Sequence, residues 1–270
     1  MASDLSDEIL ERALVGRFGR YRRVYDSIDS TNLEALRWAA EQGAGEGSLV
    51  VADTQTAGRG RWGRSWLSQP GAALMFSLVL RPEIPMEPGL ITTAGGLAVA
   101  GAIERTTGLR AAIKWPNDVL VDDRKVSGVL VETRSVGHAA NAVVLGAGIN
   151  LHRQPELPDE IAEGATSIAQ ELERKGRGRV PSRAELLASV LGDLADLYDD
   201  LGSHSGRGRI IERATALSSI LGGEVTVRFA DGSSKTGVAA SLGPDGALVL
   251  DDGTAIASGE ILRIRPFTDS

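Results

Sequence analysis

The sequence of 270 residues contains no cysteine, which excludes disulfide bonds, thiolate metal sites and a cysteine nucleophile. Its three histidines, His138, His152 and His204, are far apart and lie in no motif, which disfavours a histidine-based metal site. No apolar run approaches the roughly 20 residues of a membrane-spanning helix. The amino terminus is acidic and amphipathic, unlike a signal peptide. Together these absences predict a cytoplasmic protein without a membrane span.

Basic residues are in the minority, with 29 Lys and Arg against 36 Asp and Glu and a net charge of −7. This balance argues against general nucleic-acid binding, which needs a basic field that releases counterions. Only four of the basic residues are lysines: Lys114, Lys125, Lys175 and Lys235. The simplest explanation for the many arginines is a GC-rich genome rather than a function. The question is then why a lysine, a compact point charge, remains at these four positions.

Residues 55–66, QTAGRGRWGRSW, form a local exception to the acidic average. They place Arg59, Arg61 and Arg64 among three glycines with no acid nearby. Glycines allow the backbone to approach a ligand closely, and arginines offer planar pairs of donors that match phosphate and carboxylate. The stretch, called the Gly/Arg loop below, predicts a segment that closes over an anion.

The same loop matches the dinucleotide-binding pattern G-x-G-x-x-G over Gly58–Gly63. That pattern carries meaning only between a strand and a helix. A strand is predicted before it, but Ser65–Gly71 cannot begin a helix, and the apolar run after Gly71 reads as another strand. The context therefore excludes a Rossmann fold.

Hydrophobic periodicity predicts an α+β protein with two domains. Helices are expected over 5–17, from Ser30 onward, and over 90–107, 166–173 and 182–201. Strands are expected over 21–28, 48–55, 73–81, 111–115, 119–121, 125–134 and 142–149. After Gly222 five short strands follow in fewer than 50 residues, which is typical of a small β-barrel. We place the boundary near 218–222, giving domains 1–219 and 220–270.

Two of the four lysines lie in the stretch 113–132, IKWPNDVLVDDRKVSGVLVE. Pro116 ends a strand, so Asn117 and Asp118 project polar groups at the strand end, and Lys125 begins the next strand after a turn. A lysine ammonium there can contact two anionic groups at once. The alternative is a hairpin with solvated charges at its tip.

Five motifs in one order resemble the biotin protein ligase family. They are Ser30-Thr31-Asn32, the Gly/Arg loop, Lys114-Trp-Pro-Asn-Asp118, Lys125-Val-Ser-Gly-Val-Leu-Val-Glu132 and Gly146-Ala-Gly-Ile-Asn150. Their order and spacing match the family over roughly residues 20–155, and the terminal barrel stands where the family has one. Five motifs in register are far more specific than any one of them.

The resemblance implies a two-step reaction. Biotin and Mg-ATP give biotinyl-5′-AMP, and a lysine of a biotin carrier domain of an acyl-CoA or pyruvate carboxylase then displaces AMP. It implies a mixed sheet with helices on one face, as in class II synthetases, followed by a small SH3-like barrel. No metal site is implied beyond the Mg²⁺ that ATP carries.

The resemblance also implies a role for individual residues. It assigns the biotin pocket to Ser30, Thr31, Asn32, Gln55, Gly58, Arg59, Gly60, Arg61, Lys125 and Gly128. It assigns ATP and the adenylate to Arg61, Arg64, Trp66, Asn117, Lys125 and Asn150. It assigns catalysis to Lys125, Asp118 and Arg61, with Lys125 between the biotin carboxylate and the α-phosphate, and Asp118 orienting or deprotonating the acceptor lysine.

Simpler structural roles remain open for several of these residues. Ser30 or Thr31 is also expected as a helix N-cap, and Asp118 could merely pair with a cation such as Lys114. Trp62, Trp66 and Trp115 could be core residues, and at least one of them is expected to cover the ligand instead.

Competing functions also remain. A lipoate or octanoyl ligase shares the catalytic fold, although the Gly/Arg loop and the Lys-Trp-Pro-Asn-Asp motif favour biotin. A bifunctional ligase and repressor is disfavoured, because 29 residues before Ser30 are too few for a DNA-binding domain of about 60 residues. The sequence leaves open whether the chain is a monomer or a homodimer.

Overall fold

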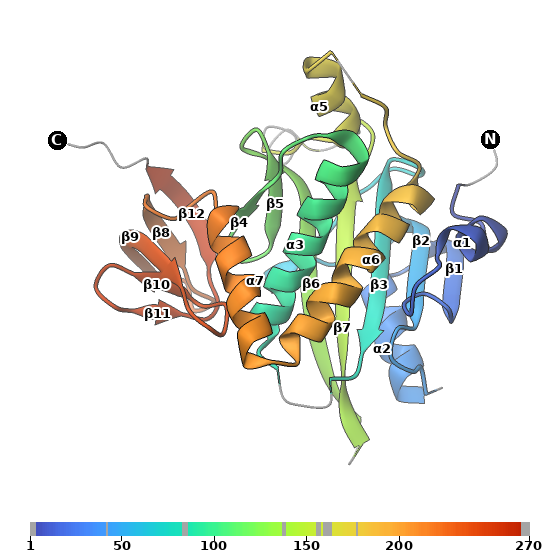
Figure 1. Ribbon diagram of the computed structural model, residues 1–270, viewed down its shortest axis with the longest axis horizontal. Coiled ribbons are helices and arrows are strands. Elements are labelled where there is room, and N and C mark those ends of the chain that lie inside the picture. Colours follow the sequence, from blue (N-terminus) through green and yellow to red (C-terminus); the bar gives the residue numbers. More distant parts are fainter. Residues whose placement is uncertain are drawn as a thin grey trace.

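The computed structural model describes residues 4–41, 43–82, 86–136, 139–154, 158, 164–176 and 178–265 (Figure 1). The helices are α1 (Asp7–Ala13), α2 (Thr31–Glu41), the short 3-10 turn η1 (Arg61–Gly63), α3 (Pro88–Thr107), α5 (Ile168–Arg174), α6 (Arg183–Leu201) and α7 (His204–Ala216). The first seven strands are β1 (Arg22–Ile28), β2 (Leu49–Gln55), β3 (Ala73–Leu80), β4 (Ala112–Lys114), β5 (Asp118–Val121), β6 (Arg124–Val136) and β7 (Ala139–Asn150). The last five are β8 (Glu224–Arg228), β9 (Ser234–Leu242), β10 (Leu248–Leu250), β11 (Ala255–Ile256) and β12 (Glu260–Arg265).

The first seven strands form one mixed sheet in the order β1-β2-β3-β7-β6-β5-β4. Only β1 and β2 pair in parallel, and all the other neighbours are antiparallel. The sequence-based expectation of a mixed sheet is therefore confirmed. The long central strands β6 and β7 pair along most of their length and connect the middle of the sheet to its far edge.

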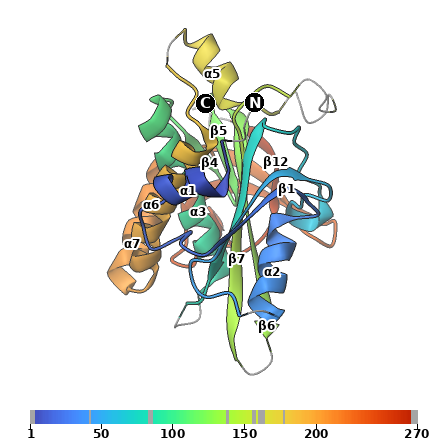
Figure 2. The same ribbon diagram turned by 90° about the vertical axis from the view of Figure 1, so that its right-hand side faces the viewer.

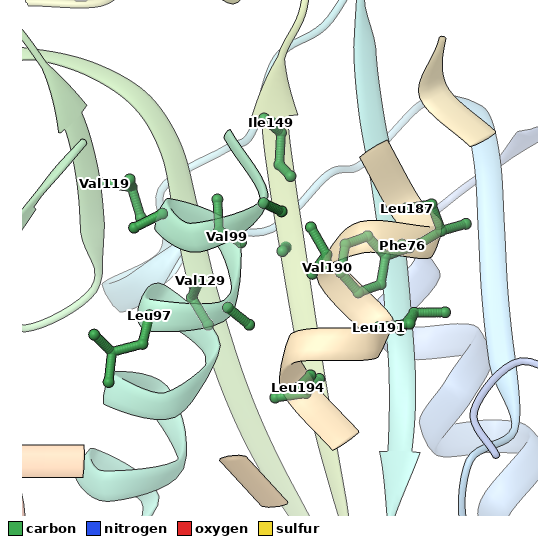
Figure 3. Close-up of a cluster of buried hydrophobic side chains, with 14 of the residues drawn as sticks. Phe76, Leu97, Val99, Val119, Val129, Ile149, Leu187, Val190, Leu191 and Leu194 are labelled. Carbon is green, nitrogen blue, oxygen red and sulfur yellow. The ribbon is translucent and has the colours of Figure 1, made fainter. Parts of the chain in front are cut away.

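One face of this sheet carries the main hydrophobic core (Figure 3). Helices α3 and α6 lie across the strands, and α7 lies beside them (Figure 1). Helix α3 is buried on almost every side, because the sheet packs against it from one direction and α6 from the other. The side chains that meet there include Phe76, Leu97, Val129, Val190 and Leu194. Each fully buried side chain of this kind contributes about 1.5–3 kcal/mol to stability.

The opposite face carries α2, so the expectation of helices on one face only is wrong (Figure 2). Strand residues alternate between the two faces, and Leu49 and Val51 point to the main core while Val50 points to α2. A smaller apolar cluster joins α2 to the strands: Ala35, Leu36, Ala39, Val50, Val79, Ala142 and Val144. Apolar residues on both faces of the central strands require cover on both sides.

Helix α7 was not expected from the sequence. Its segment HSGRGRIIERATA holds two glycines and few apolar residues, and its buried stripe is only Gly206, Ile210 and Ala214. Ser203 caps it by accepting a hydrogen bond from the Gly206 N–H at 3.1 Å. Packing against α6 and α3 supplies the stability that its composition does not. The predicted helix 5–17 is also shorter than expected and ends at Ala13.

The last five strands form a separate antiparallel sheet in the order β11-β10-β9-β8-β12, called the C-terminal sheet below. It has its own apolar core, and Trp115 from the connection between β4 and β5 belongs to that core. Trp115 Nε1 also donates a hydrogen bond to the Gly246 carbonyl at 3.0 Å. A residue of the third sequence motif thus fastens the two sheets together.

Among the helices in the described part of the chain, none has the length and apolar character needed to cross a lipid bilayer.

Candidate active site

The β5–β6 hairpin brings Lys125 and Asp118 together. Asp122 and Asp123 form its turn in the left-handed region, with φ of 47° and 61°, a conformation that Asp tolerates better than most residues. The turn that the sequence predicts before Lys125 is therefore confirmed, and β5 and β6 pair antiparallel on either side of it. Lys125 Nζ lies 2.5 Å from Asp118 Oδ1, so the partner of Asp118 is Lys125 rather than Lys114. Both charges are partly exposed, which leaves them accessible to a ligand.

The position of Lys125 is fixed through its backbone. Its N–H donates to the Gly164 carbonyl at 2.9 Å, and its carbonyl accepts from the Thr166 N–H at 2.8 Å. The segment that follows β7 is thus paired with the start of β6. Asn150 supports the same segment, because its Nδ2 donates to the Thr166 carbonyl at 3.1 Å.

A cleft of about 1160 Å³ opens around this pair. It contains ten of the residues that the sequence predicted for the site: Arg59, Gly60, Arg61, Arg64, Trp66, Asn117, Asp118, Lys125, Gly128 and Asn150. Lys114, Trp115 and Glu260 also line it. The cleft therefore gathers cations from the Gly/Arg loop, from β4 and from β6 around one space.

Two arginines of the Gly/Arg loop reach from the loop to the C-terminal sheet. Arg61 donates to the Gly259 carbonyl at 3.0 Å and to Ser258 Oγ at 2.8 Å. Burial lowers the pKa of Arg61, although Asp118 and Glu260 oppose that shift. Arg64 forms an ion pair with Glu260.

Glu260 is a carboxylate of the C-terminal sheet that sequence reasoning did not assign. Burial raises its pKa, but hydrogen bonds from Arg64 and Arg228 outweigh burial and lower the pKa below its usual value. The carboxylate is therefore ionised near neutral pH. It offsets part of the positive charge of the loop through its ion pair with Arg64.

Three of the remaining predicted residues, Thr31, Asn32 and Gln55, form a polar cluster with Ser77 beside the cleft. Gln55 Oε1 accepts from the Thr31 N–H at 2.7 Å and from Thr31 Oγ1 at 3.1 Å. Ser77 Oγ lies 2.8 Å from Thr31 Oγ1 and 2.5 Å from Asn32 Oδ1. We call Thr31, Asn32, Gln55 and Ser77 the amide cluster. It lies on the α2 face of the sheet, with Ser77 on β3 and Gln55 at the end of β2.

Ser30 and Gly58 border this cluster in structural roles. Ser30 precedes α2, and its Oγ lies 3.5 Å from the Leu33 N–H as in an N-cap. Gly58 lies at the base of the Gly/Arg loop, where its carbonyl accepts from the Trp66 N–H at 2.9 Å. Ser30 therefore has the helix N-cap role that was left open for it, whether or not it also binds a ligand.

Two glycines of β7 shape the surface between the amide cluster and Lys125. A Cβ at Gly146 would lie 1.9 Å from Asn32 Oδ1, and a Cβ at Gly148 would lie 2.3 Å from the Trp66 ring. Asn32 and Trp66 therefore lie directly on the strand backbone, two residues or about 7 Å apart along it. Gly148 pairs with Gly128, which lies beside Lys125. The cluster, the Trp66 ring and Lys125 thus follow one another along β6 and β7.

Sequence reasoning missed Ser77 and the role of Glu132. Ser77 is a single hydroxyl inside the apolar strand ALMFSLVL, and a polar side chain in a fully buried strand needs a partner. Glu132 closes the fourth motif, but no role was given to it. Its carboxylate accepts from Asn32 Nδ2 at 2.9 Å and pairs with Arg59 at 3.0 Å.

Residues 24–150, which hold all of these motifs, match the Biotin/lipoate A/B protein ligase family. The biotin–[acetyl-CoA-carboxylase] ligase of Mycobacterium tuberculosis is 30% identical, and the alignment covers 97% of this chain and 96% of that protein. The chain belongs to the biotin protein ligase family. The sequence-based identification of the family is therefore confirmed.

Other members of the biotin protein ligase family extend the comparison. The structure of biotin protein ligase from Aquifex aeolicus in complex with biotin and ATP aligns with a TM-score of 0.75 at 31% identity, covering 92% of this chain and 100% of that one. The bifunctional ligase/repressor BirA of Bacillus subtilis is 37% identical over 67% of this chain, and the match spans 55% of that protein's length. The mixed sheet with its helices is thus the biotin ligase catalytic fold.

Proposed function

We propose that the protein is a biotin protein ligase, which activates biotin with ATP to biotinyl-5′-AMP and transfers biotin to a lysine of a carrier domain. One observation carries the proposal: a polar amide and hydroxyl cluster and a lysine amid arginines lie at two ends of one surface along β6 and β7. Biotin has the matching shape, with a neutral ureido ring at one end and a carboxylate at the other.

The amide cluster suits the ureido ring. That ring offers one carbonyl acceptor and two N–H donors, and the cluster presents hydroxyl and amide groups of both kinds from Thr31, Asn32 and Gln55. All are held by protein hydrogen bonds before a ligand arrives, which lowers the entropy cost of binding. Gly58, Arg59 and Gly60 would close over the ring from the loop side.

The cations of the cleft, Lys125, Arg61 and Arg64, suit the adenylation step. The biotin carboxylate oxygen attacks the α-phosphorus of ATP, and pyrophosphate leaves, so negative charge accumulates around the reacting phosphate. Lys125 would contact both the carboxylate and the α-phosphate, while Arg61 and Arg64 would face the phosphates. Trp66, Asn117 and Asn150 would border the nucleotide. Mg²⁺ brought with ATP would screen the remaining charge.

Transfer requires a neutral acceptor amine. The acceptor lysine nitrogen attacks the acyl carbon of the adenylate, its proton is taken up, and AMP leaves with the bond electrons. Asp118 lies 2.5 Å from Lys125 Nζ, beside the proposed reaction centre, where it could orient the amine or accept its proton.

Several further assignments accompany this proposal. The acceptor would be a biotin carrier domain of an acyl-CoA or pyruvate carboxylase, in the cytoplasm. The chain would divide into a catalytic domain over 1–219 and a C-terminal domain over 220–270, whose five strands would form an SH3-like barrel.

Gly146→Ala is expected to weaken biotin binding about tenfold or more. The added Cβ would lie 1.9 Å from Asn32 Oδ1, so Asn32 must leave the amide cluster and the buried groups lose a partner. Isothermal titration with biotin measures the affinity. Gly45→Ala is the matched control, because no atom in the described part of the chain lies within 4 Å of the added Cβ there. Equal affinities of the two variants would contradict the proposed position of the ureido ring.

The Gly/Arg loop is expected to become less accessible to protease when biotin and ATP bind, since its three glycines allow the loop to move and the bound phosphates would add anionic partners for its arginines. Trypsin cleaves after arginine, so digestion followed by mass spectrometry reports the accessibility of Arg59, Arg61 and Arg64. We expect strong protection when both substrates are present. The same cleavage rate with and without substrates would contradict this closure.

One experiment tests the function as a whole. The protein is incubated with ATP, Mg²⁺ and a biotin carrier domain, together with either biotin or lipoate, and the carrier is weighed by mass spectrometry. We expect the mass increase of one biotin and no lipoyl adduct. A lipoyl adduct without biotin would refute the proposal in favour of a lipoate ligase.

A further inference from the structure

Glu132 joins two parts of the site through its two carboxylate oxygens. Oε2 accepts from Asn32 Nδ2 at 2.9 Å, and Oε1 lies 3.0 Å from Arg59 Nη2. The side chain of Glu132 is 19% exposed, whereas that of Arg59 is 42% exposed. One carboxylate thus holds a buried amide on one side and the entrance of the Gly/Arg loop on the other.

The contact with Asn32 connects Glu132 to the whole amide cluster. Asn32 Oδ1 lies 2.5 Å from Ser77 Oγ, which lies 2.8 Å from Thr31 Oγ1, and Thr31 donates to Gln55. The contacts run without a break from Gln55 to Arg59. Asn32 occupies the space that a side chain at Gly146 would fill, so its amide packs directly on the backbone of β7.

The contact with Arg59 controls the base of the loop. Arg59 pairs with Ser65 as an isolated bridge, and the Trp66 N–H donates to the Gly58 carbonyl at 2.9 Å. Fixing Arg59 therefore fixes both sides of the loop, including Trp66. The other two arginines instead contact the C-terminal sheet, where Glu260 and Ser258 occupy them. Glu132 anchors Arg59 on the main sheet, where Arg61 also reaches Asn117 Oδ1 at 3.4 Å.

We propose that Glu132 is a positioning residue that couples occupation of the biotin pocket to closure of the Gly/Arg loop, an inference that rests on the proposed function. A ureido ring that hydrogen-bonds the amide cluster fixes Asn32, and Asn32 fixes the carboxylate that holds Arg59. Coupling is reciprocal, so the closed loop holds biotin and biotinyl-5′-AMP more tightly. Glu132 itself touches neither phosphate nor the reacting carboxylate.

Glu132→Gln and Arg59→Gln test the coupling in the full chain. Glutamine keeps the size of Glu132 and an acceptor oxygen for Asn32, but it removes the charge that Arg59 needs. Each single variant is expected to release biotinyl-5′-AMP about tenfold faster and to lose trypsin protection at Arg61 and Arg64. The double variant is expected to be no worse than either single one, because both remove the same ion pair. Glu41→Gln, an exposed charge at the end of α2, is the control.

The outcomes separate this inference from the proposed function. Multiplied effects in the double variant would overturn the coupling. Full trypsin protection at Arg61 and Arg64 in Arg59→Gln would overturn it too, and that measurement does not depend on the folding of Glu132→Gln. Arg59 is a half-exposed loop residue, so its substitution does not threaten the core. Failure of the parent protein to form biotinyl-5′-AMP would instead refute the proposed function, and the coupling with it.

Discussion

Lys125→Ala is expected to slow pyrophosphate release from biotin and ATP by about 10²–10³-fold, the cost of removing one fixed donor from a charged transition state. Lys125 lines the cleft, with its ammonium 2.5 Å from Asp118, in the position where we propose that the carboxylate and the α-phosphate meet. Removing it also leaves Asp118 without its partner, which adds an uncompensated negative charge where anionic substrates must bind.

The control is Lys175→Ala, which removes another of the four lysines. Lys175 pairs with Asp122 on the outer side of the hairpin turn at 3.2 Å and does not line the cleft. We expect its pyrophosphate release to match the parent protein. Lys125→Arg keeps the charge but replaces a compact ammonium with a broader guanidinium group. Space for that group is limited, because Gly128 already lies against Lys125 Nζ. Wild-type release by Lys125→Ala would refute the role of this residue.

Trp115→Ala is expected to cost about 3–5 kcal/mol of unfolding free energy, the range for deleting a buried aromatic side chain. Trp115 is 5% exposed, belongs to the core of the C-terminal sheet and donates to the Gly246 carbonyl. Because it precedes Asn117 and Asp118 in the chain, its loss should also displace the cleft wall. Thermal unfolding and the KM for ATP are the two measurements.

Trp62→Ala is the matched control for this variant. Trp62 lies at the tip of the Gly/Arg loop and is 40% exposed, so we expect its unfolding free energy to change by about 0.5 kcal/mol or less. Trp115→Phe should recover much of the stability, because it retains most of the buried area. Equal melting temperatures for Trp115→Ala and the parent protein would show that the two sheets are not joined through this residue.

Elements with strong local signals could be predicted from the sequence. Helix α6 has a capping box at Ser182 and Glu185 and a continuous apolar stripe. Strand β3 is a largely apolar run that ends at Leu80, two residues before Pro82. Helix α7 could not be predicted, because only three small or medium-sized residues of it are buried. These residues stabilise the helix only when α6 and α3 pack against them. The same holds for α2, whose periodicity gives a helix but not the face of the sheet that it covers.

The candidate site likewise has parts that the sequence predicts and parts that only the structure decides. The Asp122–Asp123 turn predicts that one strand leads into the next, and the glycines and arginines of 58–64 predict an anion-binding loop. That Lys125 rather than Lys114 pairs with Asp118 was decided by the structure. The glycine pattern alone suggests a dinucleotide, and only the strand after it removes that interpretation. Trp115 gives no sign in the sequence that it belongs to the second sheet.

The sequence by itself determined the family, the order of the motifs and the chemistry available in each of them, because residue type and spacing are local properties of the chain. Tertiary structure alone decided which motifs meet. Asn32 contacts Glu132 across 100 residues, and Arg61 contacts Ser258 across 197. The physical reason is that such pairs depend on strand register and on helix packing, which sum over the whole core and leave no mark in the local sequence.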